Sequence, residues 1–338
     1  MLATLWDRSH YTGPPIVPLE IDIDPYENDP AKWGSSLATL VEVVRSVLEA
    51  VRPASLLEVG AYAGDLTRLL LDIAAPWDGR VTAIDPFPQP GLEALAAERP
   101  ALELIRAPSF EALAAVSRPD VAVVDGDHNY YTVSEELRLI AEASGDRLPL
   151  LLLHDVAWPH GRRDSYYDPD AIPEEHRRPM AEAVGMFPGD PGIHPDGLTY
   201  TWAAEREGGP GNGVLTAVED FVAARRGINL AIVPAFFGLA AVWPLDAPWS
   251  AGVASAIAPF DRNPVVERLE GNRVHHLADA NVLRRRAARL EERLERQEEV
   301  LRELLKSRSF SVAERISRVR QRGVPAISKD AVRRVLSD

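Results

Sequence analysis

Short apolar runs and helical stripes alternate along the first two thirds of the chain. The runs are compact and bounded by glycine, proline or polar residues, which is typical of buried strands. They lie at 56–59, 80–85, 102–106, 121–124 and 150–153. Between them apolar residues recur at helical spacing, and Leu66, Leu69, Leu70 and Ile73 predict a helix with Asp65 as its N-cap. This alternation predicts a doubly wound, mostly parallel α/β sheet with its site at the carboxyl ends of the strands.

Two further apolar runs follow each other with only a short connection. Residues 230–233 and 239–243 are joined through 234–238, so these two strands must pair antiparallel. We therefore predict a Rossmann-like sheet of seven strands that is parallel except for a terminal hairpin.

Two stretches fall outside this alternation. Residues 1–35 are rich in Pro, Asp and Tyr, and only 19–24 alternates like an edge strand; we expect this segment to cover the crevice of the sheet or a partner surface. Residues 156–212 contain several prolines and end in a glycine cluster, so we expect an irregular insert that acts as a lid. Its candidate acceptor-binding residues are Arg162, Arg163, Tyr166 and Tyr167, and its histidines His160 and His194 are expected on exposed loops.

Beyond residue 246 the apolar positions follow a different period. They recur at alternating steps of four and three, as in a coiled-coil seam, and the intervening positions are nearly all Arg and Glu. The seam consists of Leu283, Ala287, Leu290, Leu294, Gln297, Leu301 and Leu304. We favour self-association into a homo-oligomer, and one solvated helix lying against its own domain is the alternative. Arg-rich amphipathic helices are expected over 307–338.

These changes of pattern divide the chain into four parts. We expect an irregular N-terminal segment at 1–35, an α/β domain at 36–245, a linker at 246–276 and a helical coiled-coil extension at 277–338.

The composition narrows the classes of function. The 338 residues are 46% hydrophobic and 26% charged, as in a globular protein, and the formal net charge of −14 argues against a nucleic-acid partner. No apolar run approaches the length of a membrane span, and the N-terminus lacks the features of a signal peptide. The sequence contains no Cys, which excludes disulfides and thiolate chemistry. We therefore expect a cytoplasmic protein.

The most informative stretch is the turn between the first strand and the helix that follows it. Gly60 allows a tight turn, and Gly64 allows the backbone to approach a ligand. A strand, a glycine turn and a helix in this order form a nucleotide-binding crevice. However, the glycine spacing differs from that of pyrophosphate-binding loops, and Glu58 would repel phosphates. A cationic or amine-bearing ligand therefore fits this turn better.

The sequence Glu58-Val-Gly-Ala-Tyr-Ala-Gly64 resembles motif I of the class I S-adenosylmethionine-dependent methyltransferases. Asp85 ends the second strand, 27 residues after Glu58, near the separation at which such folds place a carboxylate that binds ribose hydroxyls. The alternative is that Asp85 only caps its turn. The resemblance implies S-adenosylmethionine as cofactor, with contacts at Glu58, Gly60, Ala61, Tyr62, Gly64, Asp85, Pro86, Ser109 and Asp125.

Acidic residues and histidines also follow the fourth and fifth strands. Asp125-Gly-Asp127-His128 comes after one strand and His154-Asp155 ends the next, so these side chains can converge at the carboxyl edge. Their oxygens suit Mg²⁺, and an imidazole titrates in the range of a general base. In the structural alternative, the carboxylates of Asp125 and Asp127 cap the next helix.

This pattern resembles the metal-dependent O-methyltransferases, including the catechol type and those that act on sugars or glycosylated natural products. The resemblance covers about 36–245 and implies Asp125 and Asp155 as metal ligands and His128 as the base. A third ligand is not evident; His154, or else Asp127, would have to supply it. In a metal-free version, His128 or His154 alone would deprotonate the acceptor.

The sequence thus predicts O-methyl transfer to a small hydroxylated acceptor, possible partners being sugars and glycosylated secondary metabolites, with no nucleic acid and no membrane span. Two alternatives remain. One is an NAD-dependent oxidoreductase, which shares the early strand order but not the glycine spacing or the terminal hairpin. The other is a non-catalytic methyltransferase fold that assembles through its coiled coil.

Overall fold

The computed structural model describes residues 36–321 and 328–337. The predicted irregular segment 1–35, with its candidate edge strand at 19–24, lies outside the described residues.

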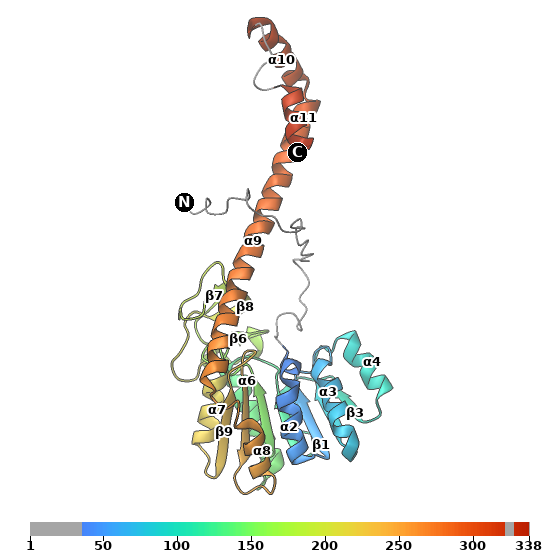
Figure 1. The fold of residues 1–338 in the computed structure, drawn as a ribbon, viewed down its shortest axis with the longest axis vertical. Coiled ribbons are helices and arrows are strands. Elements are labelled where there is room, and N and C mark those ends of the chain that lie inside the picture. Colours follow the sequence, from blue (N-terminus) through green and yellow to red (C-terminus); the bar gives the residue numbers. More distant parts are fainter. Residues whose placement is uncertain (1–35, 322–327, 338) are drawn as a thin grey trace, which may run out of the picture.

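Seven strands form the central sheet, as predicted (Figure 1). They are β1 (Ser55–Val59), β2 (Arg80–Ile84), β3 (Leu102–Ile105), β4 (Val121–Val124), β5 (Leu150–His154), β9 (Ile228–Val233) and β10 (Leu239–Pro244). Their order in space is β3-β2-β1-β4-β5-β10-β9. The pairs from β3 to β5 are parallel, whereas β10 runs antiparallel to both β5 and β9, so the terminal hairpin is confirmed. The chain order reverses between β1 and β4, which opens a crevice at their carboxyl ends.

Helices cover both faces of this sheet, which explains why its strands read as continuous apolar runs. Neighbouring residues of one strand enter different cores: Leu56 packs with the first layer of helices and Leu57 with the second. The first layer holds α2 (Val41–Val51), α3 (Asp65–Ala74), α4 (Pro90–Glu98) and α8 (Ser250–Ile257). The second holds α5 (Ser109–Leu113), α6 (Tyr130–Ser144) and α7 (Val214–Ala223).

The insert between β5 and α7 is more regular than the sequence predicted. It contains an antiparallel sheet in the order β6-β8-β7, formed by β6 (Ser165–Tyr166), β7 (Met180–Met186) and β8 (Leu198–Ala204). A buried carboxylate organises its base: Asp164 accepts hydrogen bonds from the backbone amides of Tyr130 and Gly213 and from the Tyr166 hydroxyl. Such long-range polar contacts leave no local periodicity, so the pattern of apolar residues could not reveal them.

The expected linker at 246–276 is largely helical. Helix α8 packs against α2 and buries Val253 and Ile257 in the core of the domain. The 43-residue helix α9 (Pro264–Lys306) begins inside the expected linker, where the Asn263 side chain caps it by accepting from the amides of Val265 and Val266. The expected boundary between 276 and 277 therefore falls within one continuous helix.

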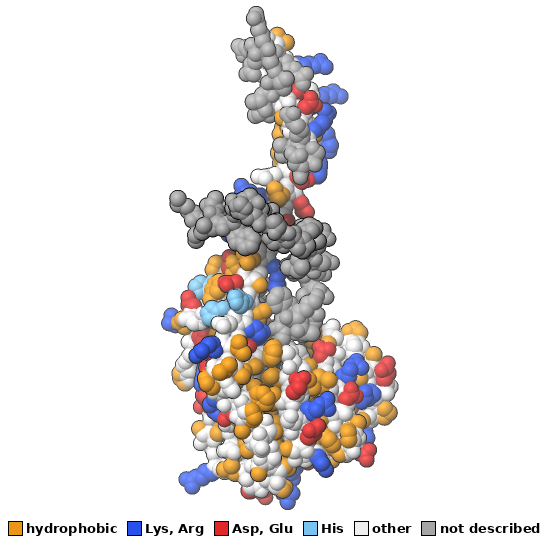
Figure 2. Space-filling model, viewed as in Figure 1, with side chains coloured by type: hydrophobic (Ala, Val, Ile, Leu, Met, Phe, Trp, Pro, Cys, Tyr) orange, Lys and Arg blue, Asp and Glu red, His pale blue; other side chains and the backbone are white. Residues whose placement is uncertain are grey.

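Helix α9 leaves the domain as a stalk, with α10 (Arg308–Gln321) and α11 (Lys329–Ser337) at its far end (Figure 1). Figure 2 shows Lys and Arg side chains gathered on the upper part of this stalk. Within the described ranges, no helix is both long and apolar enough to cross a membrane.

Candidate active site

The turns after β1 and β4 touch in the crevice where the strand order reverses. Gly60 has a φ of +87°, and a Cβ at this position would lie 2.2 Å from the carbonyl oxygen of Asp125. Only glycine therefore allows the two turns to meet. The helix predicted from Asp65 does begin there, but its N-cap is Gly64, with a φ of +85°, and Asp65 is its first residue.

The Glu58 carboxyl lies beneath these turns. Its side chain is buried, and Oε2 has no hydrogen-bond partner among the described residues. Burial raises the pKa of this carboxyl from 4.5 to about 8, and the nearby carboxylates of Asp125 and Asp85 add to the increase. Glu58 is therefore neutral at pH 7 unless a cation lies beside it.

Asp85 follows β2 and ties two turns together. Its buried carboxylate accepts hydrogen bonds from the backbone amides of Tyr62 and Phe87, both at 2.7 Å. The turn-capping role left open by the sequence is thus present, and an ionised carboxylate still has lone pairs for a ligand. Tyr62 and Phe87 are 60% and 81% exposed, and Pro86 between Asp85 and Phe87 is exposed as well.

The remaining predicted cofactor residues differ in what they can offer. Ala61 is buried in the apolar core, so only its backbone can face a ligand. Ser109 is half-buried at the start of α5, where the next strand of the sheet, β3, has just ended.

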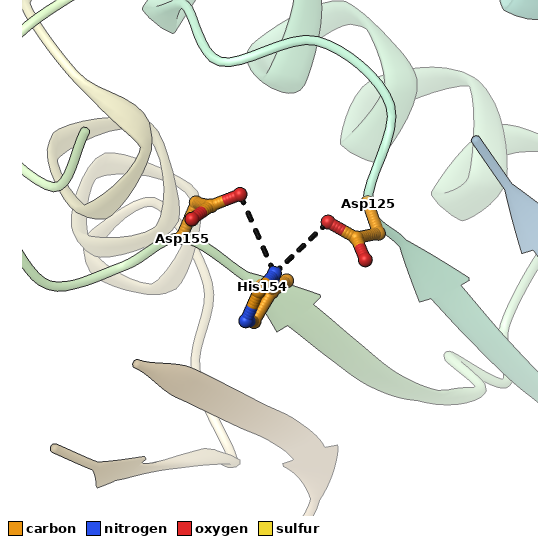
Figure 3. A group of neighbouring side chains, drawn as sticks. All are labelled: Asp125, His154 and Asp155. Atoms are coloured by element: carbon orange, nitrogen blue, oxygen red, sulfur yellow. Dashed lines mark hydrogen bonds and ion pairs between the residues drawn. The ribbon is translucent and has the colours of Figure 1, made fainter. Parts of the chain in front are cut away.

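Asp125, His154 and Asp155 converge at the ends of β4 and β5 (Figure 3). The Nδ1 atom of His154 lies 3.0 Å from Oδ1 of Asp125 and 3.4 Å from Oδ2 of Asp155. Its Nε2 atom lies 2.8 Å from the carbonyl oxygen of Phe236. Because a carbonyl oxygen can only accept, Nε2 carries a proton and Nδ1 faces the two carboxylates.

His128 joins the same cluster from the turn after β4. Its Nε2 lies 2.9 Å from Oδ2 of Asp155, so Asp155 is shared by two imidazoles. The His128 ring also packs against His160 and Tyr167, with centroid separations of 4.3 and 5.4 Å.

Charge in this cluster is set by mutual pairing. Burial alone disfavours the imidazolium of His154, but the carboxylates of Asp155 and Asp125 outweigh it and hold the pKa of His154 well above 6.5. The pKa of His128 is raised in the same way, chiefly by Asp155. Burial disfavours the Asp155 carboxylate too, yet the two histidines hold its pKa well below 3.8. The protein alone therefore favours an ionised Asp155 beside a protonated His154.

Asp127 does not take part in the cluster. Its oxygens accept from the His128 amide, the Asn129 side chain and the Thr132 hydroxyl at the start of α6. The helix-capping alternative thus holds for Asp127 but not for Asp125. Of the two residues considered for a third metal ligand, His154 alone lies with Asp125 and Asp155.

The prediction that His160 lies on an exposed loop is wrong. His160 is buried, its Nδ1 lies 3.2 Å from the Ser165 hydroxyl, and burial next to His128 lowers its pKa to about 3, so it is neutral. His194 is partly exposed and pairs with Asp190 on the insert, away from the cluster.

Three residues predicted to hold the acceptor have other partners. Arg163 is fully buried and donates to the carbonyls of Ala204, Pro191 and Gly192. Arg162 forms a two-fold ion pair with Glu219 of α7. Tyr166 is buried against Asp164. Tyr167 alone fits the prediction, because this residue is 73% exposed and its ring lies beside His128.

Two participants were missed at the level of the sequence. Glu136 of α6 is buried near Asp127, and burial raises its pKa from 4.5 to about 8. Glu136 lies among Val133, Leu137 and Ile140 on the apolar stripe of its helix. A carboxyl on an apolar stripe could have indicated a buried acid from the sequence alone. The Phe236 carbonyl could not have been found, because a backbone acceptor leaves no mark on residue type.

Comparison with known proteins identifies the class of this domain. Residues 57–156, from β1 to the residue after Asp155, match a family model described as a methyltransferase domain. No match was found among curated proteins.

Several solved structures are similar to this chain. An S-adenosylhomocysteine-bound methyltransferase of Podospora anserina, PaMTH1, is 14% identical, with 66% of this chain and 85% of that one covered and a TM-score of 0.41. A 1,6-didemethyltoxoflavin-N1-methyltransferase of Burkholderia thailandensis is 16% identical, covers 62% and 78% of the two chains, and has a TM-score of 0.38. DesVI of Streptomyces venezuelae is 11% identical, covers 65% and 100%, and has a TM-score of 0.37. These likenesses are weak, so the sheet order of this chain itself defines the fold.

The family match coincides with the sheet order and with the glycine turn after β1. This match argues against the alternative prediction of an NAD-dependent oxidoreductase. Residues 57–156 therefore lie in a methyltransferase domain, and the predicted resemblance to methyltransferases is confirmed for this part of the chain.

Proposed function

We propose that this protein transfers the methyl group of S-adenosylmethionine to a hydroxyl oxygen of a small acceptor, such as a sugar or a glycosylated secondary metabolite. The observation that carries the proposal is the convergence of Asp125, His154 and Asp155 beside the crevice of the sheet. Two carboxylates and an imidazole can bind a divalent cation and so orient an acceptor hydroxyl.

The donor atoms of this cluster fit a metal ion. The ligand atoms of the three residues all lie within 4.8 Å of one another. The Nε2 proton of His154 is committed to the Phe236 carbonyl, which is how metal-bound histidines commonly use their second nitrogen. Asp125, His154 and Asp155 would hold Mg²⁺, and the imidazole also suits Mn²⁺. A bound cation supplies a lower pKa for the acceptor hydroxyl and a fixed position for its oxygen.

His128 is the better placed general base. Both nitrogens of His154 are engaged and its side chain has no exposed surface, so it cannot reach an acceptor. The His128 side chain is 15% exposed, and Asp155 orients its ring through Nε2. Asp155 thereby leaves the other ring nitrogen, Nδ1, to take the proton of the acceptor hydroxyl. In the metal-free version, the same residue would perform the deprotonation alone.

We assign the cofactor to the turns after β1 and β2. The Glu58 carboxyl is buried, and its Oε2 has no hydrogen-bond partner among the described residues, so it suits the positive charge of the cofactor. Asp85 suits the ribose hydroxyls. Gly60, Ala61, Tyr62, Gly64, Pro86, Ser109 and Asp125 complete the assignment. The domain contributes mainly by holding the methyl donor and the acceptor oxygen in line.

Tyr167 supports a ring-bearing acceptor. Its exposed ring lies beside His128, where an aromatic face can pack on the apolar side of a sugar or a polycyclic ring. Because Arg162 and Arg163 are engaged elsewhere, an acidic acceptor is not favoured.

Incubation with S-adenosylmethionine labelled in its methyl group and an extract of the host cell tests the proposal. We expect label in the small-molecule fraction, on oxygen by mass spectrometry and nuclear magnetic resonance. Label found only on nitrogen or carbon would contradict O-methyl transfer. Cofactor binding by calorimetry without transfer to any fraction would instead support the non-catalytic scaffold.

We also infer that the stalk forms a homo-oligomer. The face of α9 that carries Val274, Ala278 and Asn281 packs on its own domain, and Arg285 and Arg289 extend this contact to Pro195 and Asp196 of the insert. The seam lies on another face of the helix, where Leu283, Leu290 and Leu294 are 64%, 50% and 58% exposed. An apolar stripe flanked by Arg and Glu suits a second copy of the helix.

Substitution tests this seam more cleanly than truncation. Removing everything after Pro244 would also remove α8, whose Val253 and Ile257 belong to the domain core. The double variant Leu290→Arg and Leu294→Arg should lower the molar mass measured by light scattering, whereas Glu299→Arg on the opposite face should not. A monomeric parent protein would contradict the inference.

A further inference from the structure

The turn at 234–238, between β9 and β10, is conformationally strained. Phe236, Phe237 and Gly238 have successive φ values of +50°, +66° and +91°. A left-handed conformation costs about 1–2 kcal/mol for each residue that carries a Cβ, so the two phenylalanines need support from outside the turn. Part of it comes from Ala157 after β5, whose amide donates to the Phe237 carbonyl at 2.6 Å.

One peptide unit of this turn connects helix α9 to the catalytic cluster. Its carbonyl, that of Phe236, accepts the Nε2 proton of His154 at 2.8 Å. Its amide, that of Phe237, donates to Oε1 of Glu270 on α9 at 2.9 Å. The carbonyl and amide of a trans peptide point in opposite directions. The carboxylate that holds the amide therefore also aims the carbonyl at His154.

Burial and an ion pair hold the Glu270 side chain in this position. It is 9% exposed, and Arg273 one turn later contacts it through Nε and Nη2, both at 2.6 Å. The Arg273 guanidinium also lies over the Phe237 ring, 4.4 Å from its centroid, and 5.4 Å from that of Phe236. A charged acceptor strengthens the amide hydrogen bond and polarises the peptide, which makes its carbonyl a better acceptor.

We propose that Glu270 is a positioning residue for the catalytic cluster: through the Phe236–Phe237 peptide it fixes the His154 ring so that Nδ1 faces Asp125 and Asp155. Arg273 holds Glu270 in place. The stalk helix is thereby part of the site, although it lies outside the matched residues 57–156. This inference rests on the role proposed for His154.

The imidazole of His154 gives a direct readout that needs neither metal nor cofactor. In the protein labelled with ¹⁵N-histidine, nuclear magnetic resonance should show a protonated Nε2 whose proton exchanges slowly with solvent. Glu270→Ala should remove this exchange protection and shift both ring nitrogens. Glu270→Gln keeps an acceptor for the Phe237 amide and should retain most of the protection. It also covers the case in which the alanine variant does not fold.

Metal affinity gives the second readout. Titration with Mn²⁺ should show affinity reduced roughly 10- to 100-fold in Glu270→Ala, the usual effect of removing a group that orients a metal ligand. Affinity for S-adenosylmethionine should be unchanged. The control is Glu267→Ala, an exposed glutamate in the first turn of the same helix, which should match the parent in both measurements.

Two outcomes would overturn the inference. One is a His154 spectrum in Glu270→Ala identical to that of the parent, and the other is an equal change in Glu267→Ala. A parent protein that binds no Mn²⁺ would contradict the proposed metal site instead, and the His154 spectrum would still decide the role of Glu270.

Discussion

Acidic residues at the two halves of one sheet edge meet opposite electrostatic conditions. Glu58 of β1 is buried in the core near the carboxylates of Asp125 and Asp85. Burial, and to a lesser extent these carboxylates, raise its pKa to about 8. Asp155 after β5 is buried to a similar degree, but His154 and His128 hold its pKa well below 3.8. The difference shows that burial does not set the charge of an acid; the partners buried with it do.

This contrast separates the two proposed binding functions. We propose that the half with Glu58 and Asp85 takes an organic cation, and its buried carboxyl would ionise only when that cation binds. In the other half, two histidines hold the pKa of Asp155 well below 3.8, so a metal ion would meet a carboxylate that is already ionised. Each of the following changes acts on one half and should leave the other intact.

Removing the metal or one of its ligands should have the largest effect. Exhaustive treatment with EDTA, or Asp155→Asn, should lower turnover by about 10³-fold, because a bound cation contributes several kcal/mol to the transition state. Mg²⁺ or Mn²⁺ should restore the treated protein and Ca²⁺ should do so poorly, since its shell is larger and looser. Cofactor affinity, measured by calorimetry, should stay unchanged.

Asp127→Asn is the matched control, since Asp127 is the neighbouring carboxylate that only stabilises the start of α6. It should lower thermal stability without altering the metal dependence. Full activity in EDTA would eliminate the metal and leave His128 as a simple base.

Replacing the proposed base should have the next largest effect. His128→Ala should reduce kcat by about 10²-fold, the lower end of the range for losing a general base, and should flatten the pH–rate profile. Mn²⁺ affinity should persist, because His128 is not among the three converging ligands. His194→Ala, which removes an exposed ion pair of the insert, should leave kcat unchanged. An unaltered pH profile in His128→Ala would remove His128 from the mechanism.

The half that binds the cofactor should respond to Asp85→Ala. Loss of charge-assisted hydrogen bonds should weaken S-adenosylmethionine binding by about 1.5–3 kcal/mol, or about 10- to 150-fold. Asp120→Ala is the matched control, because Asp120 also accepts from two backbone amides, those of Ala54 and Ser55, but at the opposite edge of the sheet. Equal cofactor affinity in both variants would mean that Asp85 only caps its turn.

The pH dependence of cofactor binding should show the smallest effect. The raised pKa of Glu58 keeps its proton on the free protein at pH 7, and a cationic ligand selects the ionised form. Binding should therefore release a proton, and affinity should rise about tenfold between pH 7 and pH 9. Calorimetry in buffers of different ionisation enthalpy measures this release.

Glu58→Gln should abolish the proton release. Glu136→Gln, which removes a second buried carboxyl with a pKa of about 8, should preserve it. The same linkage acts on folding: without cofactor, stability should decline as pH rises from the unfolded pKa of 4.5 through about 8, and less so in Glu58→Gln. Cofactor affinity that is flat across pH 7 to 9 would place the cation away from Glu58.

The sequence by itself determined the framework of this protein. Strands covered on both faces must be apolar throughout, so the runs from Leu56 to Leu153 revealed the sheet, and the five-residue connection at 234–238 revealed its antiparallel end. Gly60 predicted the tight turn after β1. The structure gives the reason, because a side chain at this position would collide with the backbone of Asp125. Residues that end adjacent strands must be neighbours, which is why Asp125, His154 and Asp155 could be brought together in advance.

Only the tertiary structure decided which polar groups meet and which are charged. Asp125 and Asp127 are two residues apart, yet one faces His154 and the other supports α6. Arg163 was predicted to bind the acceptor, but its buried side chain donates to three backbone carbonyls. The Phe236–Phe237 peptide unit joins His154 to Glu270 across contacts of 82 and 33 residues in sequence. Such contacts depend on how distant segments pack, and neither residue type nor local periodicity encodes that packing.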